Sequence, residues 1–160
     1  MRIPLIGLDR QTKSITGEFL NEIEKILDKG WFVLGEKLRE FEEEFARYSG
    51  VKYAIGVGSG TDALLLSLKA IGVGPGDEVL VPANTFIATA EAITHSGATP
   101  VFVDVDARTY NIDVRDARVT ERTKAVIPVH LYGQPADMDE VRDFAEKFGL
   151  TIIEDASQAH

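Results

Sequence analysis

The sequence predicts an α/β protein in which a mostly parallel β-sheet lies between two layers of helices. Short apolar runs, several of them rich in β-branched residues, begin about every 25 residues from residue 53 onward. Helical patterns separate most of these runs, and strands that alternate with helices at this spacing form βαβ units. A parallel sheet built from such units is covered by helices on both faces. We therefore expect a three-layer α/β/α architecture.

Two helical patterns occupy the first fifty residues. Apolar residues recur at steps of three and four between Ile15 and Leu27, and Gly30 follows as a stop signal. The same spacing continues from Leu38 to Tyr48. The loop between the two patterns, GWFVLG, is apolar, and an exposed loop of this kind favours contact with a partner surface.

Five apolar runs are predicted to be strands, and three of the segments between them are predicted to be helices. The link at residues 106–124 is less regular, and we expect a loop with a short helix there. The predicted strands are YAIGV (53–57), EVLVP (78–82), PVFVDV (100–105), AVIPVH (125–130) and TIIED (151–155), and the predicted helices are TDALLLSLKAIG (61–72), IATAEAITHSG (87–97) and DMDEVRDFAEKFG (137–149). Ligands of open α/β sheets bind outside the carboxyl ends of the strands, so the residues after each strand are the candidates for a site.

The composition argues against several kinds of partner and site. The 160 residues have a net charge of -9, whereas nucleic acids and anionic membrane surfaces bind clusters of Lys and Arg. There is no cysteine and the three histidines are scattered, so no metal site is expected. No apolar run reaches the roughly 18 residues of a membrane span, and the N-terminal apolar stretch is too short for a signal peptide. We expect a cytoplasmic protein.

The stretch GSGTDA follows the first predicted strand and begins a helix. Gly58 and Gly60 allow close approach of a ligand to the backbone, while Ser59 and Thr61 add hydroxyls beside the free N–H groups of the helix. Such a turn suits a phosphate, but it could equally be a capped turn that binds nothing. Asp62 would repel a phosphate unless its side chain points away. The letters also fit a dinucleotide fingerprint, but the next strand does not end in the acidic residue that a ribose requires.

Three further side chains at strand ends are candidates for a ligand site. Phe86 follows the second predicted strand, where its ring could stack on a planar ligand or belong to the core. Glu154 and Asp155 end the last predicted strand, and a carboxylate buried there needs a cationic partner such as a protonated pyridine nitrogen. A helix cap or a structural ion pair is the plainer alternative for this acidic pair. His130 also ends a strand and could face the site or be structural.

A phosphate-binding turn, an aromatic side chain and a strand-end aspartate follow one another in this order along the chain. Together they describe a cofactor that has a phosphate, a flat ring and a basic ring nitrogen. Pyridoxal 5'-phosphate fits all three features. A carboxylate paired with its ring nitrogen keeps that nitrogen protonated, so that the ring can accept electrons from a developing carbanion.

The chain resembles the N-terminal part of the DegT/DnrJ/StrS sugar aminotransferases, which belong to the aspartate aminotransferase superfamily of fold type I. The resemblance covers nearly the whole chain in order. It implies a helical segment at residues 1–50 and a partial large domain, which binds the cofactor, at residues 51–160. The matching stretches are IPLIGLDRQ, DKGWFVLGEKLREFEEEFARYSGVKYAIGVGSGTDALLLSL, GPGDEVLVPANTFIATAEAI, PVFVDVD, YNID, AVIPVHLYGQPADMD and IIEDASQAH.

The resemblance implies a role for each of six residues in binding the cofactor. Gly60 and Thr61 would hold the phosphate, and Phe86 would stack on one face of the pyridine ring. Ser157, where the family often has alanine, would pack beneath the opposite face. The two remaining contacts would come from Asp155, paired with the ring nitrogen, and from Gln158, hydrogen-bonded to the ring hydroxyl.

The same resemblance implies the reaction and the partners. An amino group would pass, commonly from glutamate, to a keto group on a nucleotide-linked sugar used for polysaccharides or other glycans. The family also implies a homodimer with the active site at the interface. Two alternatives remain: a relative without the lysine that acts as a sugar dehydratase or regulatory protein, and, more remotely, an NAD-dependent oxidoreductase.

No residue of the chain is expected to serve as the catalytic Schiff-base lysine. In the family that lysine lies beyond the EDASQ motif, and none of the eight lysines here stands at a corresponding place. Later strands of the sheet and the small C-terminal domain are also expected to be missing. By themselves, the 160 residues are therefore expected to be inactive.

Overall fold

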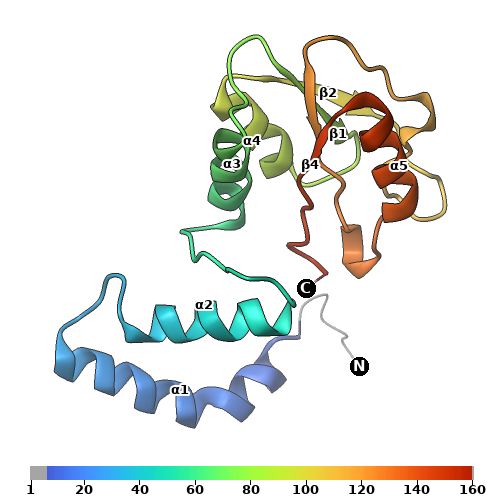
Figure 1. Cartoon of the computed structure of the whole chain (residues 1–160). Coiled ribbons are helices and arrows are strands. Elements are labelled where there is room, and N and C mark those ends of the chain that lie inside the picture. The colour runs from blue at the N-terminus through green and yellow to red at the C-terminus, as the bar shows by residue number, and fades with distance from the viewer. Residues whose placement is uncertain (1–6, 160) are drawn as a thin grey trace. The chain divides into compact units, whose positions relative to one another are not determined.

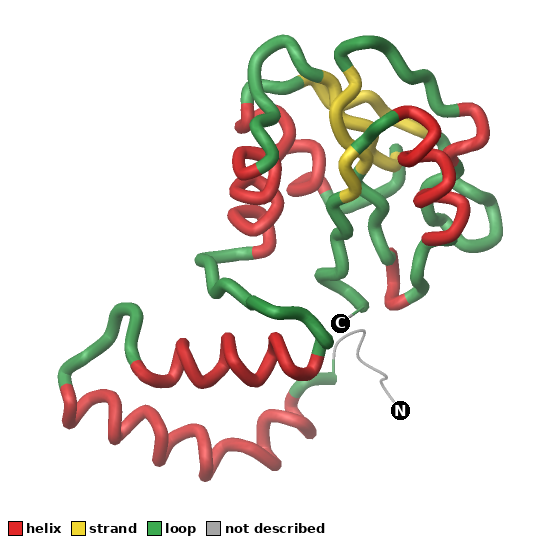
Figure 2. Tube along the Cα trace, in the orientation of Figure 1, coloured by secondary structure: helices red, strands yellow, loops and turns green. Residues whose placement is uncertain are grey.

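The computed structural model describes residues 7–159, which form two compact units. One unit ends at Gly56 and the other begins at Val57 (Figure 1). Within the described residues, all strands lie in the second unit (Figure 2). Residues 3–6 of the IPLIGLDRQ stretch and His160 lie outside the described residues. The domain limits at residues 50 and 51 stay a prediction, because compactness alone does not define a domain.

The first unit is a pair of helices, α1 (Asp9–Lys29) and α2 (Glu36–Tyr48), and both predicted helices are confirmed. Gly30 ends α1 in the left-handed conformation, with a φ of 62°, and its N–H donates to the carbonyls of Ile26 and Leu27. No residue of α1 is buried, and the side chains of the connecting loop, Trp31 to Leu34, are also exposed.

The second unit is a parallel sheet with helices on both faces, which confirms the predicted three-layer class. The strands lie in the order β2-β1-β3-β4, and every pair is parallel. The strands are β1 (Glu78–Pro82), β2 (Thr99–Val103), β3 (Thr123–Val126) and β4 (Thr151–Ile152). The helices are α3 (Gly60–Ala70), α4 (Ile87–Ser96) and α5 (Met138–Phe148), of which α3 and α4 lie together on one side of the sheet in Figure 1.

Alternation along the central strand β1 divides the core into two layers. Val79 and Val81 pack with residues of α3 and α4, while Leu80 packs with residues of α5 on the opposite face. All five residues of β1 are buried. Because both faces of a central parallel strand are covered, such a strand is apolar throughout rather than alternating with polar residues.

The predicted strand at residues 53–57 is wrong. These residues have no regular structure, and Tyr53 and Ile55 are 72% and 80% exposed. A strand requires a hydrogen-bonded neighbour, and no described segment pairs with this run. The expectation of a loop with a short helix is confirmed for residues 106–122, which contain one 3₁₀ helix, η1 (Val114–Asp116), whereas the last two residues of the predicted link already belong to β3.

Glu78 links the start of β1 to the loop before β3, and its hydrogen bonds predict an acid-dependent contribution to stability. Thr120 Oγ1 donates to Glu78 Oε2 at 2.6 Å, and Arg122 Nε donates to Oε1 at 2.9 Å. These bonds lower the pKa of Glu78 in the folded protein. Because the folded pKa lies below the unfolded value, the stabilisation is complete above the unfolded pKa and is lost as the pH falls through the folded pKa.

The variant Glu78→Gln is therefore expected to melt at a lower temperature than wild type at neutral pH. Its melting temperature should also fall less than that of wild type between about pH 5 and pH 3, where such carboxylates become protonated. Glu121→Gln removes the same charge from an exposed side chain nearby and serves as the control. Thermal unfolding followed by circular dichroism measures both effects, and parallel pH profiles for wild type and Glu78→Gln would contradict the prediction.

Candidate functional site

A pocket of about 230 Å³ lies in the second unit, at the carboxyl ends of the strands. All six residues to which the family resemblance assigns a role contribute to the lining of this pocket. They are Gly60, Thr61, Phe86, Asp155, Ser157 and Gln158, and the lining is completed by Leu64, Thr85, Ala88, Thr89, Val129 and Leu131. The structure thus brings the turn before α3, the start of α4 and the segment after β4 together around one cavity.

The turn that begins α3 offers unpaired N–H groups to this pocket. Ser59 caps the helix, since its Oγ accepts from the N–H of Asp62 at 3.1 Å. Among the described residues, the N–H groups of Gly60 and Thr61 have no hydrogen-bond acceptor. Free N–H groups at a helix N-terminus attract anions, because the helix dipole adds a partial positive charge there.

The carboxylate of Asp62 does not line the pocket. Its Oδ2 accepts a hydrogen bond from Ser59 Oγ at 2.9 Å. The same oxygen lies over Gly58, only 2.8 Å from the position that a Cβ would take there, so residue 58 must be a glycine for this arrangement to form. Asp62 is therefore engaged by Ser59 and adds no carboxylate to the lining of the pocket.

The turn and the strand-end aspartate face the same side of the sheet. A Cβ added to Gly60 would lie 3.3 Å from Ser157 Oγ, and this hydroxyl donates to Asp155 Oδ1 at 2.7 Å. Asp155 is 8% exposed. Its backbone extends the sheet beyond β4, because its N–H donates to the carbonyl of Pro128 at 2.9 Å and its carbonyl accepts from His130 at 3.0 Å.

Asp155 is a buried carboxylate whose partners among the described residues are neutral. Oδ1 accepts from the N–H and the hydroxyl of Ser157, and Oδ2 accepts from Thr89 Oγ1 at 3.1 Å. It forms no ion pair with a described residue. A buried anion is stabilised most strongly by a cation, so this carboxylate suits a positively charged group of a ligand. The ion-pair alternative therefore does not apply to Asp155 among the described residues.

Gln158 is oriented by a strained residue of a neighbouring loop. Its Oε1 accepts from the N–H of Tyr132 at 2.6 Å. Tyr132 adopts the left-handed conformation, with a φ of 57°, which is uncommon for a residue other than glycine. Because the amide oxygen is used in this way, the NH₂ group of Gln158 is the part left to donate to a ligand.

Phe86 stands at the N-terminus of α4 and is 70% exposed. It lines the pocket but does not belong to the core of the second unit. The alternative that Phe86 is a core residue is therefore wrong. An aromatic ring at the mouth of a pocket can cover one face of a planar ligand.

His130 and Glu154 are bound to each other outside the pocket. His130 Nδ1 accepts from the N–H of Ala136, so Nε2 bears the proton and donates to Glu154 Oε2 at 3.0 Å. His130 is buried with both nitrogens satisfied, which identifies it as structural. Of the two acidic residues that end the strand, only Asp155 lines the pocket.

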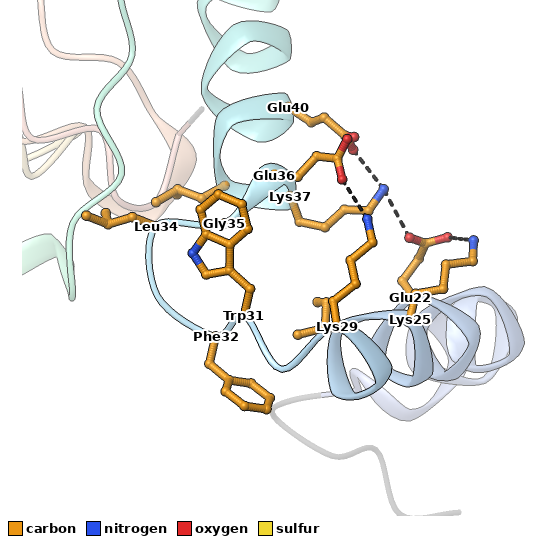
Figure 3. A pocket seen from close by; sticks show the side chains of 12 residues that line it. Glu22, Lys25, Lys29, Trp31, Phe32, Leu34, Gly35, Glu36, Lys37 and Glu40 are labelled. Atoms are coloured by element: carbon orange, nitrogen blue, oxygen red, sulfur yellow. Dashed lines mark hydrogen bonds and ion pairs between the residues drawn. The ribbon is translucent and has the colours of Figure 1, made fainter.

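A second pocket, of about 370 Å³, lies in the first unit between α1 and α2 (Figure 3). Hydrogen bonds to Glu40 and Glu22 raise the pKa of Lys37 there. The six charged side chains that line this second pocket form ion pairs with one another, in the two groups Lys25–Glu22–Lys37–Glu40 and Lys29–Glu36. A charged ligand would have to break these pairs, so we do not regard this pocket as the functional site.

Sequence reasoning missed two polar residues of the site, Thr85 and Thr89. Their four-residue spacing places them on one side of α4 and its N-terminal extension, beside Phe86. This spacing was the one available signal, but threonines at such spacing are common and do not by themselves indicate a ligand. Within residues 7–159, no group of three potential ligands is placed to hold a metal ion. No helix in this range is both long and apolar enough to cross a membrane.

Proteins of known function match the chain closely along its length. A protein from Acidithiobacillus ferrooxidans, UDP-N-acetyl-3-dehydro-alpha-D-glucosamine 3-aminotransferase, is 53% identical over 159 residues, which is 98% of this chain and 43% of that protein. The dTDP-3-amino-3,6-dideoxy-alpha-D-galactopyranose transaminase of Aneurinibacillus thermoaerophilus is 46% identical over 99% of this chain and 44% of its own length. The chain thus spans less than half the length of these relatives.

Solved structures show the same fold. S. venezuelae DesV in complex with a ketimine intermediate is 46% identical and superposes with a TM-score of 0.95 over 99% of this chain and 43% of its own. The protein ntda from Bacillus subtilis, with bound cofactor PMP, is 39% identical with a TM-score of 0.94 over 99% of this chain and 37% of its own. The model of the DegT/DnrJ/EryC1/StrS aminotransferase family matches residues 13–160. The chain belongs to this family of aminotransferases.

Proposed function

We propose that the pocket at the carboxyl edge of the sheet binds pyridoxal 5'-phosphate in an aminotransferase. The substrate is a keto sugar linked to a nucleotide, and the amino donor is commonly glutamate. The observation that carries this proposal is the buried carboxylate of Asp155, which has only neutral partners among the described residues and faces the same pocket as the free N–H groups of Gly60 and Thr61. The names of the two relatives described above state sugars linked to UDP and to dTDP.

The residues of the pocket match the cofactor part by part. The N–H groups of Gly60 and Thr61 would bind the phosphate, and Phe86 would cover one face of the ring. The carboxylate of Asp155 would accept a hydrogen bond from the protonated ring nitrogen. When bound, pyridoxal phosphate supplies a cationic ring that withdraws electrons from the bond to be broken.

Two further residues complete the proposed contacts. The amide NH₂ of Gln158 would donate to the ring hydroxyl, in the orientation that its bond to Tyr132 leaves open. Ser157 would lie against the second face of the ring while its hydroxyl donates to Asp155. No described residue that lines the pocket is a lysine, so we propose that the reactive lysine lies outside residues 7–159.

The size of the pocket supports a small cofactor as its occupant. At about 230 Å³, it is below the roughly 300–1,000 Å³ of sites for drug-sized ligands. A cofactor of one ring and one phosphate suits this volume.

Titration of the intact protein with pyridoxal phosphate tests the proposal. Binding should shift the absorbance band of the free cofactor, and treatment with sodium borohydride should fix the cofactor covalently to a lysine, which peptide mass spectrometry would locate. With glutamate and a UDP- or dTDP-linked keto sugar, the loaded protein should form 2-oxoglutarate. If the band of the free cofactor does not shift and borohydride fixes no cofactor to the protein, the proposal is wrong.

We further propose that the protein is a cytoplasmic homodimer. The exposed apolar loop from Trp31 to Leu34 is a surface that a second copy would cover. A cytoplasmic location agrees with the lack of cysteine in these 160 residues, because disulfides are typical of proteins in oxidising compartments and these residues can form none. Sedimentation equilibrium of the intact protein decides between monomer and dimer.

A regulatory function is the second candidate, and one relative favours it. A protein of Geobacillus stearothermophilus that is 47% identical over 99% of this chain is named a pleiotropic regulatory protein. A protein of this kind could bind the cofactor without transferring an amino group. Cofactor binding without formation of 2-oxoglutarate, for any keto sugar tested, would favour this second candidate over the first.

A further inference from the structure

Two threonine hydroxyls connect the start of α4 with the carboxylate of Asp155. Thr89 Oγ1 donates to Asp155 Oδ2 at 3.1 Å, and Thr85 Oγ1 lies 3.0 Å from Thr89 Oγ1. Thr89 is only 1% exposed. Water therefore does not compete for its hydroxyl, and the bond to Asp155 is stronger than it would be at the surface.

The hydrogen bond between the two hydroxyls can run in only one direction. A threonine hydroxyl has a single proton and so donates one hydrogen bond, although it can accept two. The proton of Thr89 is engaged with Asp155, which cannot donate while it is ionised. Thr85 must therefore donate to Thr89, and the hydrogen bonds run from Thr85 through Thr89 to Asp155.

Another threonine of α4 shows what the side chain of Thr89 could have done instead. Thr94 Oγ1 donates to the carbonyl of Ala90, four residues earlier, at 3.0 Å. This is the usual bond of a threonine inside a helix. Thr89 instead contacts a residue 66 positions away in the sequence, at the centre of the pocket.

The hydrogen bonds of Asp155 leave one acceptor position open. An ionised carboxylate has about four positions at which it can accept a hydrogen bond. Two of those on Oδ1 are taken by the N–H and the hydroxyl of Ser157, and one on Oδ2 is taken by Thr89. The remaining position belongs to Oδ2, the oxygen that Thr89 holds.

We propose that Thr89, supported by Thr85, is a positioning residue that holds the carboxylate of Asp155 with this open position directed at the ring nitrogen of the bound cofactor. The inference rests on the proposed function, because it assumes that pyridoxal phosphate occupies the pocket. It adds a role for two residues that do not themselves touch the ring nitrogen. Without Thr89, the carboxylate is held only through Oδ1, by Ser157, and Oδ2 has no protein donor to fix its direction toward the ring.

The test compares four variants of the intact protein: Thr89→Val, Thr89→Ser, Thr85→Val and the double variant Thr85→Val with Thr89→Val. The dissociation constant of pyridoxal phosphate is measured by absorbance titration. With ¹⁵N-labelled cofactor, the chemical shift of the ring nitrogen reports its hydrogen bond directly. Valine keeps the shape of threonine and removes the hydroxyl, whereas serine keeps the hydroxyl and removes the methyl group.

Thr89→Val should weaken cofactor binding about tenfold, as expected for one hydrogen bond to a charged group. It should also shift the ¹⁵N resonance. Thr89→Ser should bind within about twofold of wild type and leave the resonance in place, because the hydroxyl is retained. Thr85→Val should cost about threefold, and the double variant should bind no more weakly than Thr89→Val, because Thr85 acts only through Thr89.

Three results would overturn the inference. Binding of the cofactor to Thr89→Ser as weak as to Thr89→Val would assign the effect to packing of the methyl group. A loss of affinity in the double variant equal to the product of the two single losses would show that the hydroxyls act independently. If Thr89→Val fails to fold, an unchanged ¹⁵N shift and dissociation constant in the less buried Thr85→Val would exclude the chain of hydrogen bonds. Failure of the wild-type protein to bind the cofactor overturns the proposed function as well, whereas failure confined to the variants overturns this inference alone.

Discussion

Asp155→Asn is expected to weaken the binding of pyridoxal phosphate by about 150- to 4,000-fold, because it removes one partner of a buried charged pair at a cost of roughly 3–5 kcal/mol. The amide is nearly the same size as the carboxylate but is uncharged, so it cannot hold the ring nitrogen in its protonated form. It also has only one oxygen. The donors of Ser157 and the hydroxyl of Thr89 now point at two separate oxygens, and in the variant one set of them would face an NH₂ group.

Glu154→Gln provides the matched control for this variant. It removes a carboxylate from the neighbouring position, but Glu154 is bound to His130 outside the pocket. Cofactor affinity should remain within about twofold of wild type, since Glu154 is partly exposed and does not line the pocket. Absorbance titration of both variants measures the effect. Equal affinities for Asp155→Asn and wild type would show that Asp155 does not meet the ring nitrogen.

Local sequence signals were sufficient to predict which segments of the chain form the site. An apolar run ending in Asp155 and a glycine-rich turn at Gly60 each identify the carboxyl end of a strand or the start of a helix. In a parallel sheet these ends share one edge, so their proximity follows from the class of fold. The resemblance to a known family then supplied a role for each residue, and those roles stay predictions until the cofactor is bound.

The contacts that depend on tertiary structure could not be read from the sequence. Thr89 donates to a residue 66 positions away, and no local pattern distinguishes it from Thr94 in the same helix. The run at residues 53–57 shows the opposite error. Its composition is typical of a strand, but a strand forms only where a neighbour offers a free edge, and the described residues provide no such neighbour for it.

The helix that begins at the proposed phosphate-binding turn is packed on the sheet through its buried leucines, of which Leu68 is fully buried. The side chain of Leu68 projects from α3 and lies in a cluster with Val79 of β1 and Ile93 of α4. Leu68→Ala should destabilise the second unit by about 3–5 kcal/mol, the cost of lost apolar burial plus the cavity left behind. The melting temperature should fall by roughly 12 °C or more, because each kcal/mol shifts it by several degrees in a domain of this size.

Leu66→Ala makes the same chemical change two residues earlier on α3, where the side chain is 51% exposed, and should alter stability by no more than about 0.5 kcal/mol. Comparing the two variants by thermal unfolding separates burial from helix propensity, because leucine and alanine are both good helix formers. The turn at Gly60 and Thr61 is rigid only while α3 stays packed on the sheet, so Leu68→Ala should also weaken cofactor binding without any change in the residues that touch the cofactor. Equal melting temperatures for Leu66→Ala and Leu68→Ala would mean that α3 is not anchored through this face, and that the turn is held by its cap at Ser59 alone.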